Sequence, residues 1–142
     1  MARNRLVVVG GVVVLVVLVV LVVVGNVSAH TNPPVTTTIQ WDSPETEKLI
    51  RAACMDCHSN ETKWPWYAYI APASFLITDD VTEGRDAMNL STGHDVEGDE
   101  MIEEIRGGEM PKAPYPMLHP DANLTADQKA QLIAGIQATF GG

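Results

Sequence analysis

The chain has 142 residues, and its first quarter differs from the rest in composition, so about one hundred residues remain for one small domain. All eighteen acidic residues lie at or beyond Asp42, and the same part of the chain contains seven Lys and Arg residues. Its net charge is therefore 7 − 18 = −11. This balance argues against nucleic acid as a partner, because phosphate binding needs clustered Lys and Arg. Two cysteines are too few for a disulfide framework or a four-cysteine zinc site.

The N-terminal segment has the composition of a membrane span. Leu6 to Val24 are nineteen consecutive Val, Leu and Gly residues, and at 1.5 Å each they cover about 28 Å, close to the hydrocarbon core of a bilayer. Arg3 and Arg5 precede this run, which predicts that the N-terminus lies in the cytoplasm. We therefore expect a single transmembrane anchor over residues 1–25 in the cytoplasmic membrane, with the domain on its outer, periplasmic side.

A cleaved signal peptide is the alternative to this anchor. Val27-Ser28-Ala29 offers small residues at a plausible cleavage site. The apolar run is nevertheless longer than the usual 7–15 residues of a signal core. Residues 26–41 follow with a proline pair and no periodicity, which predicts an extended linker before a domain over residues 42–142.

The domain is expected to be all-α, because no stretch of it alternates as a strand would. A first helix should begin after Ser43, a favourable N-cap, with Pro44 at its first position, and run into Cys54. The last helix should begin at the capping box Thr125-Ala126-Asp127-Gln128. Three shorter helices are expected between them: one after Pro72, one over roughly Thr82 to Met88, and one over roughly Asp99 to Arg106 that Gly107-Gly108 ends.

The run Cys54-Met55-Asp56-Cys57-His58 carries the most specific chemistry in the chain. Two thiols at this spacing can meet the two vinyl groups on one edge of a porphyrin, and the adjacent imidazole can then reach the iron. A thioredoxin-type redox pair would need an α/β context, and a zinc site would need further ligands. A simple disulfide would leave the histidine unexplained. We therefore predict one covalent haem c on Cys54 and Cys57, with His58 as the proximal ligand.

Further motifs follow Cys54–His58 along the chain, and their combination is distinctive. In order, these motifs are Trp64-Pro65-Trp66-Tyr67, Glu83-Gly84-Arg85, Gly108-Glu109-Met110-Pro111, Tyr115 and His119-Pro120. From about Ser43 to Ile136 the chain resembles the bacterial and archaeal haem-binding domain family related to class I cytochromes c. The resemblance implies a small class I cytochrome c-like fold that carries one haem and transfers electrons.

An electron-transfer haem usually has Met or His as its second axial ligand. Met110 lies 52 residues after His58, beyond the expected helix end, and Pro111 stiffens its loop. The position of a loop methionine in class I cytochromes supports the same residue. We predict Met110 as the distal ligand and keep His119 and Met117 as alternatives.

Three further expectations concern the surroundings of the haem. Aromatic residues after the attachment site should wrap it, namely Trp64, Trp66, Tyr67 and Tyr69. The Pro72 carbonyl is a candidate acceptor for the second ring N–H of His58. Six acids lie between Asp95 and Glu104, either as a solvated helix start or as a docking patch for a basic redox partner.

Together these features predict a membrane-tethered mono-haem c-type cytochrome that carries single electrons between redox partners rather than an enzyme. The alternatives are a haem peroxidase, which needs an open iron position with a distal acid–base pair, and a haem-based gas or redox sensor, which needs an output module. Neither a distal His/Arg pair nor an output module is evident in the sequence. We also expect the first and last helices of the domain to cross closely, with Gly135 against Ala52 or Ala53.

Overall fold

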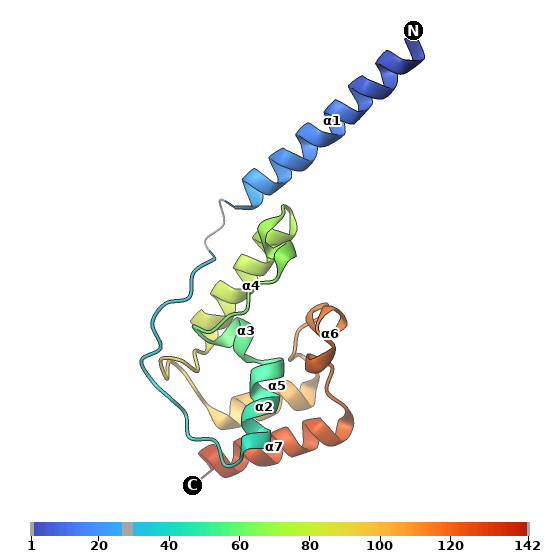
Figure 1. The fold of residues 1–142 in the computed structure, drawn as a ribbon. Helices are drawn as coiled ribbons and strands as arrows, with labels where there is room; N and C mark the ends of the chain where they lie inside the picture. The colour runs from blue at the N-terminus through green and yellow to red at the C-terminus, as the bar shows by residue number, and fades with distance from the viewer. Residues whose placement is uncertain (1, 27–29, 142) are drawn as a thin grey trace. The chain divides into compact units, whose positions relative to one another are not determined.

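The computed structural model describes residues 2–26 and 30–141, with the side chains of α1 described from Arg5 onward. Over these residues the chain is helical, and its one β feature is an isolated bridge between Asn89 and His94. The elements in chain order are α1 (Ala2–Gly25), α2 (Pro44–Ala53), α3 (Met55–His58), η1 (Trp66–Tyr69), α4 (Ala73–Ala87), α5 (Gly98–Gly107), α6 (Tyr115–Leu118), η2 (Pro120–Ala122) and α7 (Ala126–Phe140), most of which are labelled in Figure 1. The predicted all-α class is confirmed.

The chain divides into two compact units, and the boundary between them falls within α4. Unit 1 comprises the residues up to Thr31 together with Trp64–Asp80. Unit 2 comprises Asn32–Lys63 and the residues from Val81 onward. The predicted cleavage site at residues 27–29 lies outside the described residues.

Helix α1 has the length and composition of a membrane span. Arg5–Gly25 is a run of 21 residues with a mean hydropathy of 3.6. A membrane span and a signal sequence both have these properties, so α1 is a candidate for either. Between Arg5 and Asn26, nearly every side chain of this helix is exposed, as a segment surrounded by lipid would be.

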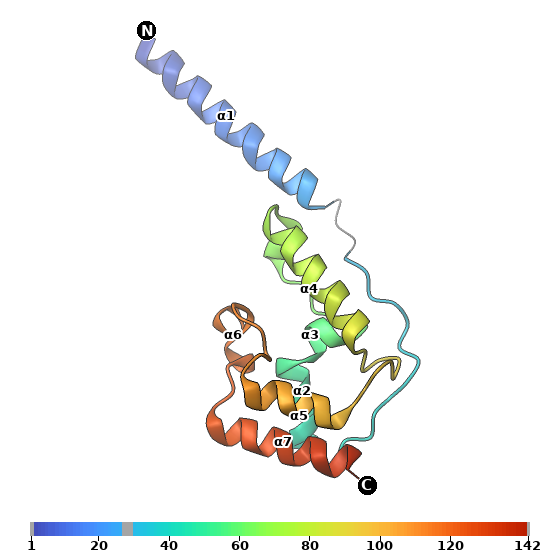
Figure 2. The ribbon, with the colours of Figure 1, turned by 180° about the vertical axis from the view of Figure 1, so that it is seen from behind.

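The core of unit 2 lies between α2, α5 and α7. Figure 2 shows α5 beside α7, and both α5 and α2 contact α7 directly. Ile50, Leu132 and Ile136 are among the most completely buried side chains, each at most 1 % exposed. Burying an aliphatic side chain of this size contributes about 1.5–3 kcal/mol, so these residues largely determine how the three helices pack.

Two of the helix starts were predicted correctly from local chemistry. The Ser43 side chain accepts the backbone N–H of Thr46, and Pro44 opens α2. At α7 the Thr125 side chain accepts the N–H of Gln128 while the Gln128 side chain accepts that of Thr125, which completes the capping box. Helix α5 ends at a left-handed Gly108, as its glycine pair predicted.

Two other expectations about the helices were wrong. The helices expected after Pro72 and over Thr82 to Met88 are one continuous helix, α4, because no proline interrupts the segment. Gly135 is buried and faces α2, but it lies against Thr46 instead of Ala52 or Ala53. The sequence identified the two helix faces that meet, but not their register along the axes.

Residues 32–41 have no regular structure, and several of them bond to the rest of unit 2. The backbone N–H groups of Thr36 and Thr37 both donate to the Ser91 carbonyl at 2.9 Å. Asn60 donates from its side chain to the Pro34 carbonyl, also at 2.9 Å. Further along, Trp41 packs edge-on against Phe140 of α7, with ring centroids 5.8 Å apart. This part of the linker is therefore held against the domain at several points.

Candidate functional site

The two cysteines and the histidine lie on one short helical turn. Cys54 ends α2 and precedes α3, and its carbonyl accepts the backbone N–H groups of Cys57 at 3.3 Å and His58 at 2.9 Å. Both cysteines are free thiols. The sequence spacing therefore becomes a compact arrangement in which two thiols and one imidazole come from neighbouring positions of the same turn.

The His58 ring is held by the backbone of α4 and the residue that follows it. Its Nδ1 lies 2.8 Å from the Gly84 carbonyl oxygen and 3.3 Å from that of Met88. A carbonyl oxygen can only accept, so Nδ1 carries the hydrogen and Nε2 keeps a free lone pair. This is the tautomer that a metal-binding imidazole requires. The expected acceptor, the Pro72 carbonyl, was wrong.

Gly84 permits the close contact that makes this hydrogen bond possible. A Cβ atom at this position would lie 2.7 Å from the Cys57 carbonyl oxygen and 3.1 Å from the Cys57 Cβ. No side chain larger than hydrogen fits there unless α4 moves away from α3. The glycine therefore lets the carbonyl of residue 84 reach the imidazole of His58.

Arg85, the next residue, fixes the segment that follows His58. Its Nε donates to the Ser59 carbonyl and its Nη2 to the Thr62 hydroxyl oxygen, both at 2.8 Å. The Thr62 hydroxyl in turn donates to the Asp56 carbonyl at 2.8 Å. The Glu83-Gly84-Arg85 motif thus acts through two neighbouring positions, one for close approach and one for hydrogen bonding.

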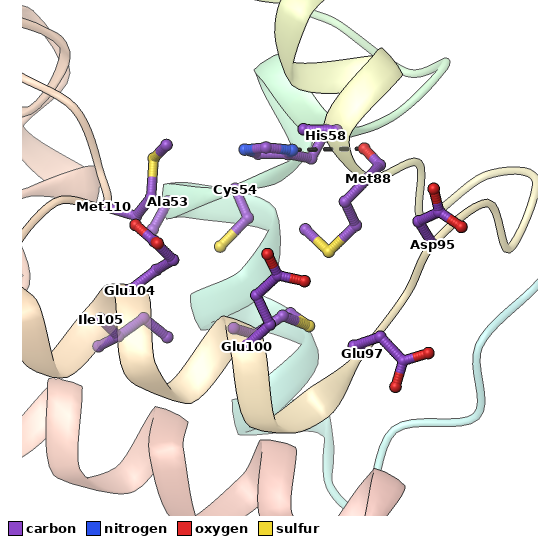
Figure 3. A pocket seen from close by; sticks show the side chains of 12 residues that line it. Ala53, Cys54, His58, Met88, Asp95, Glu97, Glu100, Glu104, Ile105 and Met110 are labelled. Carbon is purple, nitrogen blue, oxygen red and sulfur yellow. Dashed lines mark hydrogen bonds between the residues drawn. The ribbon is translucent and has the colours of Figure 1, made fainter.

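A cavity of about 240 Å³ opens beside His58, far more than the roughly 15 Å³ that one water molecule requires. Figure 3 shows the side chains around it. Its lining combines aliphatic groups, sulfur atoms, the imidazole and a set of carboxylates, contributed by Ala53, Cys54, His58, Ala87, Met88, Asp95, Glu97, Glu100, Met101, Glu104, Ile105 and Met110. Such a lining suits a large, partly apolar ligand with a metal atom near its centre.

Three of the four residues predicted for the site line this cavity, namely Cys54, His58 and Met110. In Figure 3 the His58 nitrogen that is not bonded to a carbonyl is on the side of the ring where Met110 lies. Cys57 is not among the lining residues, and its backbone and Cβ face Gly84. The structure therefore brings the imidazole, one thiol and the predicted thioether to one cavity.

The alternative distal ligands lie elsewhere in unit 2. Met117 belongs to α6 and is 81 % exposed. The His119 ring stacks on Tyr115 with centroids 4.0 Å apart, and it lines a different cavity together with Lys48 and Arg51. Neither residue lines the cavity beside His58.

Sequence reasoning missed two other methionines of the cavity, Met88 and Met101. Met101 is 7 % exposed and belongs to the core cluster of α5. Met88 follows α4 and is the residue whose carbonyl faces the His58 ring. Met88 lies four residues after Gly84 and therefore on the same side of the chain. The sequence could have placed Met88 at the cavity only if Gly84 had already been known as the acceptor for His58.

The aromatic residues expected to wrap a haem do not line this cavity. They belong to unit 1, where Trp64 and Tyr69 pack against the ring of His30, with centroids 4.7 and 4.4 Å from it. His30 also donates from Nε2 to the Ala68 carbonyl at 2.6 Å. His30, assigned to the linker from the sequence, thus organises η1 and its surroundings.

Four acids of the run between Asp95 and Glu104 lie around the cavity, namely Asp95, Glu97, Glu100 and Glu104.

Burial and, to a smaller extent, the neighbouring Cys57 raise the pKa of the Cys54 thiol to about 12. The Cys54 thiol is therefore protonated at neutral pH in the haem-free chain. A protonated thiol is a poor zinc ligand and a poor redox nucleophile.

Comparison with known families identifies the chain. A family model described as a haem-binding domain matches residues 13–138, which is most of the sequence. The chain belongs to this haem-binding domain family. No curated protein and no solved structure matches it at a significant level.

The residues of the cavity fit the haem that the family binds. His58 presents a free imidazole nitrogen, Met88 and Met110 supply thioethers, and Ala53 and Ile105 supply apolar surface. The chain offers no comparable site for a metal ion without a porphyrin. Within residues 2–26 and 30–141, no group of three or more His, Cys, Asp and Glu side chains could hold such an ion. The lining of this cavity is therefore compatible with the haem that the family assignment implies.

Proposed function

We propose that this haem-binding protein is a mono-haem c-type cytochrome, tethered to the cytoplasmic membrane by α1, that carries single electrons between redox partners on the outer side. Cys54 and Cys57 would hold the haem through thioether bonds, and His58 would be the proximal iron ligand. When bound, the haem supplies a one-electron ferric–ferrous couple. The chain's own residues provide attachment, axial ligation and a docking edge.

The observation that carries this proposal is the hydrogen bond from His58 Nδ1 to the Gly84 carbonyl at 2.8 Å. It orients the ring and leaves Nε2 available at a cavity that Cys54 also lines. A histidine with a merely structural role would gain nothing from a free nitrogen at such a cavity. Cys57, which directly precedes His58 in the sequence, supplies the second thiol.

Met110 is our candidate for the distal ligand. It lines the same cavity, whereas Met117 and His119 do not. A thioether opposite His58 would close the sixth position of the iron, as an electron carrier needs. A peroxidase or a gas sensor would instead need an open iron position.

The acids around the cavity support a docking edge for a basic redox partner. Asp95, Glu97, Glu100 and Glu104 come from α5 and the segment before it, and all four line the cavity. Carboxylates near an exposed cofactor edge attract positively charged partners and increase their association rate. Arg3 and Arg5 precede the apolar run of α1, and they support a cytoplasmic N-terminus and an outer domain.

The absorption spectrum of the reduced protein, recorded with and without carbon monoxide, tests the proposal. An electron carrier with methionine on the iron should show a low-spin spectrum that carbon monoxide changes slowly or not at all. A rapid and complete change would contradict the closed iron and favour the enzyme or sensor alternatives. A mature N-terminus at His30 would contradict the tether.

A further inference from the structure

Unit 1 contains a second long segment without charged residues, in addition to the apolar run of α1. The fifteen residues from Trp64 to Thr78 include no Asp, Glu, Lys or Arg. Several large apolar side chains in this segment are exposed: Trp66 by 76 %, Leu76 by 66 % and Phe75 by 48 %. Exposed apolar groups of this size on a strongly acidic protein indicate a surface that is covered in its working environment.

The same segment is bonded to the last turn of α1. The Ala71 N–H donates to the Leu21 carbonyl at 3.2 Å. The Asn26 side chain donates to the Tyr69 carbonyl at 3.4 Å. A Cβ atom on Gly25 would lie 2.5 Å from the Tyr69 carbonyl oxygen, so the two backbones are in direct contact. The segment therefore lies at the level of the final turn of the helix.

Burial along α1 marks the same contact. From Arg5 to Asn26 the side chains are exposed, apart from a half-buried Leu21 and a buried Gly25. These two positions are four residues apart, so they lie one above the other on a single helix face. This stripe is where the segment 64–78 covers α1.

The length of α1 places this contact at the edge of a bilayer. The 21 residues of Arg5–Gly25 extend about 32 Å at 1.5 Å per residue, against a hydrocarbon core of about 30 Å. The helix thus has almost no surplus length, and its last turn must reach the boundary between acyl chains and headgroups. A segment that donates a hydrogen bond to Leu21, one turn before Gly25, lies at that boundary too. This step rests on the transmembrane role of α1 in the proposed function.

The chemistry of the segment suits that boundary. Trp and Tyr side chains favour the membrane interface because each combines an apolar ring with a polar group. Backbone groups near lipid must find partners within the protein, and here His30 bonds the Ala68 carbonyl while the Ser74 N–H donates to the Ile70 carbonyl at 3.0 Å.

We propose that residues 64–78 form an interfacial membrane element beside α1, with Trp66, Phe75 and Leu76 inserted into the leaflet where the C-terminal end of α1 emerges. The protein would then contact the membrane twice, through the helix that spans it and through this segment that lies within its interface. A second copy of the chain or a soluble partner could cover the same apolar groups, but neither would explain the hydrogen bonds that join Tyr69 and Ala71 of this segment to the end of a membrane span.

Labelling from the lipid phase tests this proposal on the full-length haem-loaded protein. The protein is reconstituted into vesicles of phosphatidylethanolamine and phosphatidylglycerol that contain a lipid with a diazirine in its acyl chain near the headgroup. After illumination, mass spectrometry locates the modified residues. Met117 is the matched control, because it is 81 % exposed but belongs to α6 in unit 2 and not to the segment 64–78.

We expect labels on α1 and on Trp66, Phe75 and Leu76, with at least tenfold more label on Leu76 than on Met117. If α1 is labelled and these three residues carry no more label than Met117, the interfacial element is wrong while the membrane tether stands. If α1 also remains at the level of Met117, the tether itself fails, and the interfacial element fails with it.

Discussion

The imidazole of His58 donates a hydrogen bond from Nδ1 to the carbonyl oxygen of Gly84 at 2.8 Å, and this bond depends on the absence of a side chain at residue 84. The carbonyl belongs to α4 and the imidazole ends α3, so this contact connects the turn that holds Cys57 and His58 to the helix that packs on it.

Replacing Gly84 by Ala should destabilise the haem-loaded protein by about 1–3 kcal/mol, because the new Cβ would lie 2.7 Å from the Cys57 carbonyl oxygen. Thermal unfolding followed at the haem absorbance measures this loss. Gly107→Ala is the matched control, since the nearest atom to its Cβ, the Glu109 Cγ, is 3.8 Å away. Equal melting temperatures for the two variants would show that the close approach of α4 is unimportant.

Replacing Met110 by Ala should open the distal side of the iron. The ferric spectrum should become high-spin, and the reduced protein should bind carbon monoxide rapidly, because the thioether no longer occupies the position. Met117→Ala should leave both properties unchanged, since this side chain is 81 % exposed and outside the cavity. Met88→Ala provides the decisive comparison: a high-spin spectrum in that variant and not in Met110→Ala would assign the ligand to Met88 instead.

Replacing Glu100 by Gln should raise the reduction potential, because a carboxylate beside the cavity stabilises ferric iron over ferrous iron. Removing one unit charge at a separation of about 10 Å in a water-like dielectric would correspond to roughly 0.4 kcal/mol, or on the order of 20 mV. Potentiometric titration measures the shift, which should diminish at high salt. Glu103→Gln on the same helix is the control, since Glu103 is exposed and does not line the cavity. Equal shifts in both variants would argue against a specific role of the acids at the cavity.

Replacing Gly135 by Ala should weaken the packing of α7 on α2. The added Cβ would overlap the Thr46 side chain, including its Cγ2 at 2.7 Å, and overpacking of this kind costs about 1–3 kcal/mol. Chemical unfolding of the haem-loaded protein measures the change. The double variant Gly135→Ala with Thr46→Ala should recover part of the loss, whereas strictly additive losses would place the effect elsewhere.

Local sequence chemistry predicted the helix ends, because a cap is decided by a few adjacent residues. Ser43 and Thr125 accept the N–H groups that their positions predicted, and Gly108 adopts the left-handed conformation that ends α5. The same reasoning divided α4 into two helices. The segment contains no proline, and it forms one continuous helix over Ala73–Ala87.

Contacts between distant segments could not be predicted in the same way. The acceptor for His58 is 26 residues away in sequence, and the sequence suggested the wrong carbonyl. Trp64 and Tyr69 were expected to wrap a haem on the basis of their nearness to His58 in sequence, yet they pack on His30. In both cases the partner is chosen by the tertiary arrangement, and residue type alone does not specify it.

The central claim is that one haem is bound covalently through Cys54 and Cys57. The mass of the denatured full-length protein, purified from cells with a functioning haem-attachment system, tests it most directly. We predict that the mass exceeds that of the polypeptide by one haem, and that Cys54→Ala and Cys57→Ala either release their haem into acid–acetone or form no haem-loaded protein. A wild-type mass equal to that of the bare polypeptide, in a preparation that contains haem before denaturation, would contradict covalent attachment.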